Sequence, residues 1–548
     1  MKEIVLKVKG LTCAHCEQKV RDTARKFPGV VEITEVDHTK GVGRFVSEDT
    51  VDAKRLAEAI SKTGYPATPA ESHACCAVVP KGMDVDLAVV GGGSAGFAAA
   101  IRATELGAKV ALINAGTLGG TCVNVGCIPS KTLTRAADLH YRVRHHGFGG
   151  IVCEAQTRDW PLIHRQKDEL VEALRTAKYS AVLKAYEGIR LIEGKARIEK
   201  DLSIRVDGQV VRAGRIVVAT GSQPFAPPIP GLSETGCLDN ESLMALEKLP
   251  ATMLVLGAGA IGLELAQAYA RFGVKVTIHE VAGQIAPLED ADTADELEKH
   301  LRADGIDICT CSKVVGARPE GRDKIIVAEM PDGKAREFRA EALLVATGRH
   351  AVTKDLGLEE AGVRLGKRGE IEVDDYLQTT KPGIYASGDC TNLPQFVYVA
   401  AAAGHLAAEN ALEGNKRKID LAVVPRVTFT DPQLASVGLT EKQARDRGLK
   451  VKVSKLPLEH VPRALAARDT RGLIKLVAED PTGRLLGAHI TAPEAGEMIM
   501  EPTLAMKFGL TIEDLVTTLH PYLTLAEGIK LCAQTFDKDV MKLSCCAG

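Results

Sequence analysis

The hydrophobic and polar positions of this chain follow one pattern twice. Residues 84–114 and 249–280 each contain an apolar strand, a Gly-rich turn, a helix of small residues and a second strand. In both units the second strand ends the same number of residues after the first Gly of the turn. Each unit later closes with an apolar strand and the tripeptide Ala-Thr-Gly, at 219–221 and at 346–348. The repeat predicts two complete dinucleotide-binding domains, the second inserted into the first.

The pattern differs on both sides of this repeat. The start of the chain alternates apolar and charged residues as a strand does, and helices and further strands follow, which predicts a small α+β domain. A segment with Pro69, Pro80 and Gly82 has little periodicity and is expected to be a linker. The C-terminal part alternates strands and helices and ends in the short tail MKLSCCAG. The expected boundaries are 1–67 for the first domain, 68–83 for the linker, 84–225 with 349–420 for one dinucleotide-binding domain, 226–348 for the other, and 421–548 for the C-terminal domain.

The composition is that of a globular α/β protein, with 45% hydrophobic residues, 26% charged residues and 52 Gly. A chain of 548 residues is too long for one core, so three or four domains are expected. A net charge of -2 offers no basic surface for nucleic acid. The start of the chain lacks the apolar segment of a secretory signal, and the apolar stretch 253–273 is interrupted by Gly and Glu. We therefore expect a soluble, cytoplasmic protein that binds no nucleic acid and does not insert into membranes.

Fourteen Cys residues are many for a cytoplasmic protein. In that compartment structural disulfides are rare, and paired Cys more often bind metals or carry out redox chemistry. Eight of the fourteen form pairs that are close in sequence: Cys13 with Cys16, Cys75 with Cys76, Cys122 with Cys127, and Cys545 with Cys546. The remaining Cys lie in mostly apolar or strand-like surroundings and are expected to be small core residues.

Each Gly-rich turn, GGGSAG and GAGAIG, follows a strand and opens a helix. The first Gly of such a turn makes it tight, the second lets the backbone approach a pyrophosphate, and the third allows close helix–strand packing. The helix N-terminus attracts the anion. One copy would be weak evidence, but two copies in matching contexts predict dinucleotide binding. The candidate residues are Gly91, Gly93, Ser94, Ala95, Gly96, Gly257, Gly259, Ile261 and Gly262.

The end of the second strand carries the residue that contacts ribose in such domains. In the second unit this residue is Glu280, and in the first it is Asn114, which can hydrogen-bond a hydroxyl without charge. A carboxylate repels a 2′-phosphate, so Glu280 favours NADH over NADPH.

Cys122 and Cys127 lie in the segment GGTCVNVGCIPSK, with Pro129 near a predicted helix start. A helix N-terminus lowers a thiol pKa, so Cys127 is expected to be a ready thiolate. The alternative is a pair of buried Cys in a Gly-rich turn.

This segment, the two Gly-rich units and the later GIYASGDC together resemble the pyridine nucleotide-disulfide oxidoreductases over nearly all of residues 84–548. The resemblance implies FAD in the first dinucleotide-binding domain and the nicotinamide in the second. It also implies a redox-active dithiol in which Cys127 faces the flavin and Cys122 is the outer thiol. A homodimer joined by the C-terminal domain is expected as well.

Further site residues follow from the same resemblance. Asp389 would hold the ribityl or pyrophosphate region of FAD, and Lys131 and Glu264 would form an ion pair beside the flavin that helps to orient hydride transfer. The other expected cofactor contacts are Gly120, Thr121, Thr220, Gly221 and Gly348.

The C-terminal segment HPYLTLAEG departs from the disulfide-reducing members of the family. Those members carry a His followed by Pro and then a Glu, whereas here Tyr522 occupies the slot of the base, with Glu527 five residues on. Tyr, with a reference pKa near 10, is a poor proton acceptor at neutral pH, but its oxygen can approach a cation. Ordinary dithiol–disulfide chemistry is therefore in doubt, although His520 lies close by.

Two further Cys pairs point to a soft metal ion. Cys545 and Cys546 are adjacent and almost terminal; such a pair rarely forms a strain-free disulfide but suits a soft ion, unless it is an incidental feature of a frayed end. Cys13 and Cys16 in GLTCAHC can present two thiolates to one ion, and this region resembles heavy-metal-associated domains. The resemblance implies a small ferredoxin-like α+β fold for this metal-binding domain. A thioredoxin-like redox site is the alternative for that pair, but the flanking pattern is too short for that fold.

Together these features resemble the mercuric reductases within the family, and Tyr179 matches a second Tyr that they place beside the metal. On residues alone, Tyr179 would be a core or helix-face residue. The resemblance implies reduction of Hg(II) to Hg(0) by NAD(P)H, with Hg(II) arriving as a thiol complex and the C-terminal tail completing the partner's active site. Two alternatives stay open: a disulfide reductase like dihydrolipoyl dehydrogenase, and a metal-binding chaperone with vestigial flavin domains.

Overall fold

The computed structural model describes residues 2–12, 14–39, 41–48, 50–69, 82–157 and 159–542. Five Cys residues of the predicted pairs lie outside these ranges: Cys13, Cys75, Cys76, Cys545 and Cys546. None of the helices in the described ranges is long and apolar enough to cross a membrane.

The N-terminal domain has the element order βαββαβ. Its antiparallel sheet has the strand order β2-β3-β1-β4, and its two helices pack on that sheet around a core that includes Leu6, Phe45 and Leu56. This is the ferredoxin-like arrangement expected from the sequence. The elements are β1 (Lys2–Val8), α1 (Ala14–Arg25), β2 (Val30–Asp37), β3 (Val42–Ser47), α2 (Ala53–Ser61) and β4 (Ala67–Pro69).

The first α/β domain is built on a sheet with the order β7-β6-β5-β10-β9-β8. The end of β10 that pairs with β5 also pairs with β20, through Ile216, Val217 and Val218. All residues of β5 are buried, as expected for a parallel strand covered on both faces. The first part of the domain comprises β5 (Val85–Val90), α3 (Ser94–Glu105), β6 (Val110–Asn114), α4 (Gly120–Asn124), α5 (Cys127–Arg142), α6 (Trp160–Arg175), the π-helical turn η1 (Thr176–Ser180), α7 (Ala181–Ala185), β7 (Ile189–Glu193), β8 (Ala196–Ile198), β9 (Ser203–Val206), β10 (Gln209–Val218) and β11 (Ser222–Pro224). The chain returns to it with β19 (Arg349–Ala351), β20 (Ile384–Ala386) and α11 (Val397–Glu413).

The second α/β domain contains a parallel sheet of order β14-β13-β12-β18 and an antiparallel sheet of order β15-β16-β17. It is entered after β11 and left before β19, and these two strands pair with each other. Its elements are η2 (Ser233–Thr235), α8 (Asn240–Met244), β12 (Thr252–Leu256), α9 (Ala260–Arg271), β13 (Lys275–His279), α10 (Ala291–Ala303), β14 (Asp307–Cys309), β15 (Lys313–Glu320), β16 (Asp323–Glu329), β17 (Ala335–Ala340) and β18 (Ala342–Val345).

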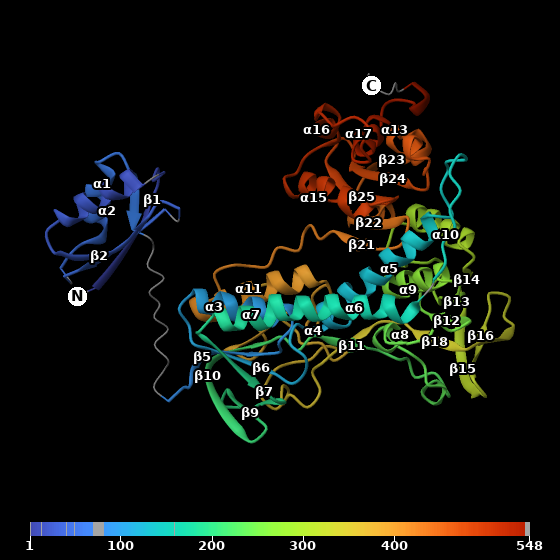
Figure 1. Cartoon of the computed structure of the whole chain (residues 1–548), viewed down its shortest axis with the longest axis horizontal. Helices are drawn as coiled ribbons and strands as arrows, with labels where there is room; N and C mark the ends of the chain where they lie inside the picture. The colour runs from blue at the N-terminus through green and yellow to red at the C-terminus, as the bar shows by residue number, and fades with distance from the viewer. Residues whose placement is uncertain are drawn as a thin grey trace.

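The C-terminal domain, orange to red in Figure 1, has an antiparallel sheet of order β21-β22-β25-β24-β23 with helices packed on it. Its elements are β21 (Arg426–Thr428), β22 (Gln433–Gly438), α12 (Glu441–Asp446), β23 (Val451–Pro457), η3 (Leu458–His460), α13 (Pro462–Ala467), β24 (Leu473–Glu479), β25 (Leu485–Ala492), α14 (Ala495–Met498), α15 (Met500–Lys507), α16 (Ile512–Thr517), α17 (Glu527–Gln534) and η4 (Val540–Lys542).

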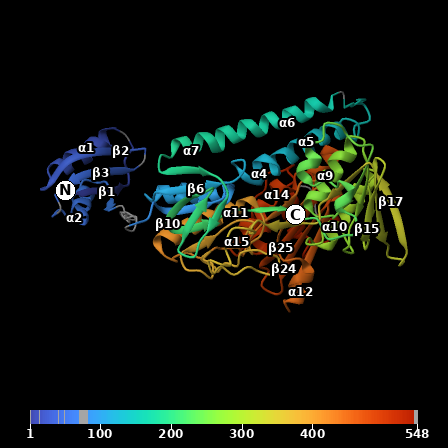
Figure 2. The same cartoon turned by 90° about the horizontal axis from the view of Figure 1, so that it is seen from below.

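Helices α5 and α9 pack against each other where the two α/β domains meet. Helix α5 packs against both α6 of its own domain and α9 of the second domain. Figure 2 shows α6 and α7 along the outer edge of the molecule, with α5 beside α6. The start of α5 and the start of α9 therefore carry side chains into the same region.

Candidate active site

The first Gly-rich turn joins β5 to α3 and is closely packed. Gly91 has a φ of +119°, and a Cβ on it would lie 2.2 Å from the carbonyl oxygen of Ala219. A Cβ at Gly96 would lie 1.8 Å from the carbonyl oxygen of Gly91. No side chain fits at either position. Gly93 is the N-cap of α3, and no side chain caps that helix, so its first backbone N–H groups are available to an anion.

This turn lines a cavity of about 310 Å³ between the two α/β domains. Residues from several distant parts of the chain meet there, because the ends of parallel strands and the starts of the following helices share one edge of the sheet. The predicted site residues that line it are Gly91, Gly93, Ser94, Ala95, Asn114, Gly120, Thr121, Cys122, Cys127, Lys131, Thr220, Gly221, Ile261, Glu264 and Asp389.

The cavity also contains side chains that were not predicted. Arg349 donates to the Ser222 hydroxyl at 2.8 Å, and that hydroxyl donates to the Asp389 carboxylate at 2.9 Å. The Oγ atom of Ser387 is buried and has no hydrogen-bond partner among the described residues. Arg349 follows the Ala-Thr-Gly tripeptide and Ser387 precedes Gly388-Asp389, so proximity to these motifs is the sequence signal that could have identified them.

The two thiols of the dithiol segment lie on consecutive helices. Cys122 is on α4, Cys127 is the first residue of α5, and neither forms a disulfide in the structure. The hydrogen bond from the Cys122 thiol, together with the charge of Lys131, lowers the pKa of Cys127 to about 7, although burial opposes this shift. The same hydrogen bond and burial raise the pKa of Cys122. Near neutral pH, Cys127 is therefore the thiolate and Cys122 the proton donor.

Lys131 lies one helical turn after Cys127 and forms an ion pair with Glu264 of α9, with 2.7 Å between Nζ and Oε2. The other oxygen of Glu264 accepts the backbone N–H of Phe429 at 2.9 Å. The Lys131 ammonium also lies 4.7 Å from the centre of the Phe429 ring. Residues from three domains thus hold one ion pair at the wall of the cavity.

Tyr179 lies in the π-helical turn η1, not in a regular helix. Its ring packs edge-to-face on Phe97 with 4.7 Å between the ring centres, and its hydroxyl hydrogen-bonds Ser94. Burial raises the pKa of Tyr179, and the nearby charges of Cys122 and Cys127 add to this shift. The core position expected from the residues alone agrees with this packing, because Tyr179 lies against the buried cluster that contains Phe97.

The second Gly-rich turn has the same geometry as the first. Gly257 has a φ of +100°, and a Cβ on Gly262 would lie 2.1 Å from its carbonyl oxygen. A Cβ at Gly259 would meet no described atom within 4 Å, which leaves room for a ligand to approach the backbone. Gly348, with a φ of +135°, is similarly open.

Asn114 and Glu280 brace the two turns in the same way. The Asn114 side chain accepts the backbone N–H of Gly92 at 3.0 Å. The Glu280 carboxylate accepts the N–H of Ala258 at 2.7 Å and that of Ala282 at 2.8 Å, and only 7% of Glu280 is exposed. Each residue therefore holds the peptide after the first Gly of its turn, a structural role that the sequence analysis did not predict.

The loop that carries Tyr522 keeps His520 and Glu527 apart. His520 contacts the Thr518 carbonyl oxygen through Nδ1 at 3.0 Å and the Glu501 carboxylate through Nε2 at 2.7 Å. Glu527 instead accepts the backbone N–H of Leu523 at 3.2 Å. Tyr522 is 49% exposed. Within the described chain, His520 is therefore paired with Glu501, and no His–Glu pair of the disulfide-reducing type involves Glu527.

In the N-terminal domain, Cys16 lies in the first turn of α1 and is buried, with its sulfur 3.6 Å from the Thr12 hydroxyl oxygen. Its predicted partner Cys13 and the tail pair Cys545 and Cys546 fall outside the described residues.

Three regions of the chain each match a known protein family or domain. Residues 85–404 match the pyridine nucleotide-disulphide oxidoreductase family, and residues 424–533 match the dimerisation domain of that family. Residues 5–66 match the heavy-metal-associated domain.

Curated relatives match over the whole length. The chain is 43% identical to a mercuric reductase of Bacillus cereus, covering 100% of this chain and 88% of that protein. It is 42% identical to a mercuric reductase of Staphylococcus aureus, covering 99% of this chain and 98% of that protein.

Solved structures match over most of the chain. The Cu(II) complex of the HOCl-induced flavoprotein disulfide reductase RclA from Escherichia coli is 33% identical, with a TM-score of 0.74, over 82% of this chain and 99% of that one. LpdA from Mycobacterium tuberculosis is 29% identical, with a TM-score of 0.73, over 83% and 100%. From its glycine turns, its paired thiols and these matches, the chain belongs to the pyridine nucleotide-disulphide oxidoreductase family, as an oxidoreductase with a dimerisation domain and an N-terminal heavy-metal-associated domain.

Proposed function

We propose that this protein reduces Hg(II) to Hg(0) with electrons from NADH or NADPH. The observation that carries the proposal is the thiol pair Cys122 and Cys127, one of them a thiolate near neutral pH, at the wall of a cavity lined by a dinucleotide-binding turn. Two close sulfur ligands suit a soft, two-coordinate ion. Relatives that match the whole chain are mercuric reductases, which supports the same choice.

FAD is assigned to the cavity between the two α/β domains, on the side of the first Gly-rich turn. The Gly91 turn leaves backbone N–H groups free at an uncapped helix start, which suits a pyrophosphate. The buried Ser387 hydroxyl, beside Asp389 in the same cavity, has no hydrogen-bond partner among the described residues and could bond a polar group of FAD. When bound, FAD would pass two electrons from the nicotinamide to the metal held by the dithiol. The residues that would hold it are Gly91, Gly93, Ser94, Ala95, Gly96, Asn114, Gly120, Thr121, Thr220, Gly221 and Asp389.

The nicotinamide cofactor is assigned to the turn around Gly259, where the backbone is open to a ligand. The buried Glu280 carboxylate places negative charge at the end of β13, where it would repel a 2′-phosphate. Lys131 and Glu264 would flank the reacting end of the nicotinamide and help to orient it.

The chemistry of the thiols follows from their unequal pKa values. The Cys127 thiolate attacks Hg(II) in a complex Hg(SR)₂ and displaces one thiolate. The Cys122 sulfur then bonds to the metal and displaces the second thiolate, which takes the Cys122 proton. Capture therefore releases one RS⁻ and one RSH. Two electrons reduce the bound ion to Hg(0), and both sulfurs are freed as thiolates. The balance is NAD(P)H + Hg(II) → NAD(P)⁺ + H⁺ + Hg(0).

Delivery of Hg(II) is assigned to the other thiol pairs. Cys13 and Cys16 would collect the ion, and Cys545 and Cys546 would pass it to Cys122 and Cys127 by exchange between thiolates, which avoids a free soft cation. In the proposed homodimer the tail and Tyr522 of one subunit complete the site of the other, where Tyr179 also lies beside the metal. Reduced thiols suit a cytoplasmic location.

A disulfide reductase is the competing function, since the flavoprotein disulfide reductase RclA shares the fold and Glu280 suits NADH. The contacts of His520 argue against a disulfide reductase. Such an enzyme would need a His–Glu pair, but His520 is bonded to Glu501, and Glu527 accepts the Leu523 N–H instead.

The deciding experiment measures nicotinamide oxidation with Hg(II) in excess thiol, with lipoamide and with glutathione disulfide, while Hg(0) is trapped from the gas phase. One Hg(0) per nicotinamide oxidised, absent from the Cys122→Ala variant, is the expected result. A larger kcat/KM for lipoamide than for Hg(II) would reject the proposal in favour of a disulfide reductase.

A further inference from the structure

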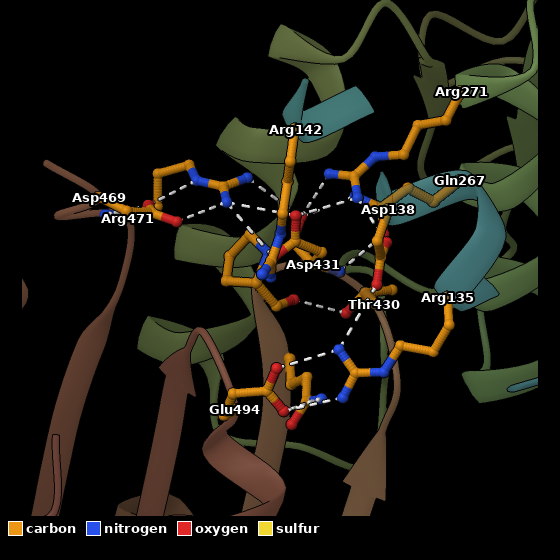
Figure 3. A network of polar contacts seen from close by, with 12 residues as sticks. Arg135, Asp138, Arg142, Gln267, Arg271, Thr430, Asp431, Asp469, Arg471 and Glu494 are labelled. Carbon is orange, nitrogen blue, oxygen red and sulfur yellow. Dashed lines mark hydrogen bonds and ion pairs between the residues drawn. The ribbon is translucent and has the colours of Figure 1, made fainter. Parts of the chain in front are cut away.

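Helices α5 and α9 each direct one row of polar side chains to their mutual junction with the C-terminal domain (Figure 3). The spacings of three, four and seven residues place each row on one helical face. The row on α5 is Lys131, Arg135, Asp138 and Arg142, and the row on α9 is Glu264, Gln267 and Arg271.

The α9 row holds the backbone of the junction segment, which is residues 429–431 of the C-terminal domain. Glu264 accepts the Phe429 N–H at 2.9 Å. The Gln267 amide accepts the Asp431 N–H and donates to the Asp431 carbonyl oxygen, both at 2.8 Å. Arg271 donates to the same carbonyl oxygen at 2.9 Å. The junction segment is therefore held at both ends. At the Phe429 end it contacts the ion pair of Lys131 and Glu264, called here the flavin-side ion pair.

The side chain of Asp431 ties the segment to three arginines. Its carboxylate lies 2.8 Å from Arg142, 2.9 Å from Arg271 and 3.2 Å from Arg471, and the residue is 2% exposed. Although burial opposes the shift, Arg471, Arg271 and Arg142 lower the pKa of Asp431. The carboxylate is thus ionised at any working pH, and its position is determined by charges from all three domains.

We propose that Asp431 is a positioning residue for the flavin-side ion pair: by anchoring the junction segment, it holds the Phe429 N–H on Glu264 and thereby keeps Glu264 on Lys131. The inference rests on the proposed function only in requiring that FAD and the nicotinamide bind beside this pair; it does not require Hg(II).

The physical reason is the number of partners of Glu264. This carboxylate is 5% exposed; Lys131 balances its charge on one oxygen, and the Phe429 N–H stabilises the other oxygen by a hydrogen bond. A shift of the segment removes the second partner, and a hydrogen bond to a buried charge is among the more costly to lose. Glu264, left with one oxygen without a donor, would shift and carry Lys131 with it, and its less stabilised negative charge would disfavour the addition of electrons nearby.

The test uses the full-length FAD-loaded protein without Hg(II). In Asp431→Asn, flavin reduction by saturating NADH is expected to slow about tenfold, the effect of losing one such hydrogen bond, with little change in the Kd for NADH. The midpoint potential of the bound flavin, measured spectroelectrochemically, is expected to become more negative.

The matched control is Glu494→Gln. Arg135 and Glu494 join α5 to the same C-terminal domain at 2.8 Å but lie at the edge of the network. A native rate and potential are expected there. If Asp431→Asn does not fold with FAD, the same measurements on Gln267→Met, which releases the Asp431 backbone, decide the matter.

A native rate and potential in the folded Asp431 variant, or an equal loss in the Glu494 control, would overturn the proposal. Failure of Hg(II) turnover in the native protein would instead refute the proposed function and leave this result intact.

Discussion

The Glu280 carboxylate accepts the backbone N–H of Ala258 at 2.7 Å, so the residue expected to meet a ribose also braces the turn that would bind the pyrophosphate. A second N–H, from Ala282, occupies its other oxygen. Its negative charge remains in place for discrimination between the two nicotinamide cofactors.

We predict that NADH supports turnover at least as well as NADPH, because a 2′-phosphate would approach the Glu280 charge. The ratio of the two kcat/KM values measures this. A strong preference for NADPH would mean that a nearby cation outweighs Glu280.

Glu280→Gln tests the two hydrogen bonds by which Glu280 holds the backbone N–H groups of Ala258 and Ala282. Gln has one acceptor oxygen, so its amide group would face one of the two N–H donors, and the folded protein should lose about 1–3 kcal/mol of stability. Chemical denaturation measures the loss, and KM for NADH should rise with it. Asn114→Asp keeps the acceptor for Gly92 but loses the amide donor to the Gly116 carbonyl oxygen, so it should also destabilise the fold.

Cys122→Ala and Cys127→Ala are both expected to retain FAD, because neither thiol forms the phosphate turn, and to lose Hg(II) turnover. Cys127→Ala should also lose the long-wavelength absorbance of a thiolate–flavin complex. Visible spectra and Hg(0) release report the two effects. Substantial turnover in both variants would contradict the dithiol mechanism.

The terminal pair is expected to deliver Hg(II) and not to reduce it. Changing Cys545 and Cys546 to Ala should cripple turnover of the bulky complex Hg(glutathione)₂, spare more of the turnover of HgBr₂, and leave flavin reduction unchanged. Mixing this variant with a Cys122→Ala subunit should restore activity if the tail works across the dimer. Equal losses with both complexes would assign the tail to the reduction step.

Asp138 gives a pH-dependent stability. Burial, followed by the charge of Asp431, raises the pKa of Asp138 to about 6, above its usual value of 3.8. Because the folded protein binds the Asp138 proton more tightly than the unfolded chain does, the protonated carboxyl stabilises the fold. This contribution is complete below the unfolded-state pKa and is lost as the pH rises through the folded-state pKa of about 6. Asp138→Asn does not undergo this loss, so its stability relative to the native protein should rise between pH 4 and pH 7, by on the order of 2–3 kcal/mol. Denaturation curves at the two pH values measure the difference, and a constant difference would contradict it.

The sequence by itself determined the features that depend on neighbouring residues. Gly91, Gly96, Gly257 and Gly262 were recognisable because a tight strand–turn–helix connection excludes a Cβ, whatever surrounds it. The placement of Cys127 at a helix start follows from the same local rules.

Only the tertiary structure decided how distant residues meet. Glu264 was expected beside Lys131 by resemblance, but its bond to the Phe429 N–H, 165 residues away, appears only when three domains pack. The same is true of the chain from Arg349 to Asp389 and of the pairing of His520 with Glu501. The sequence pattern reports which side chains are buried and in which element, because burial follows local periodicity. It does not report which buried polar groups face each other, since that depends on the angles at which helices and sheets pack.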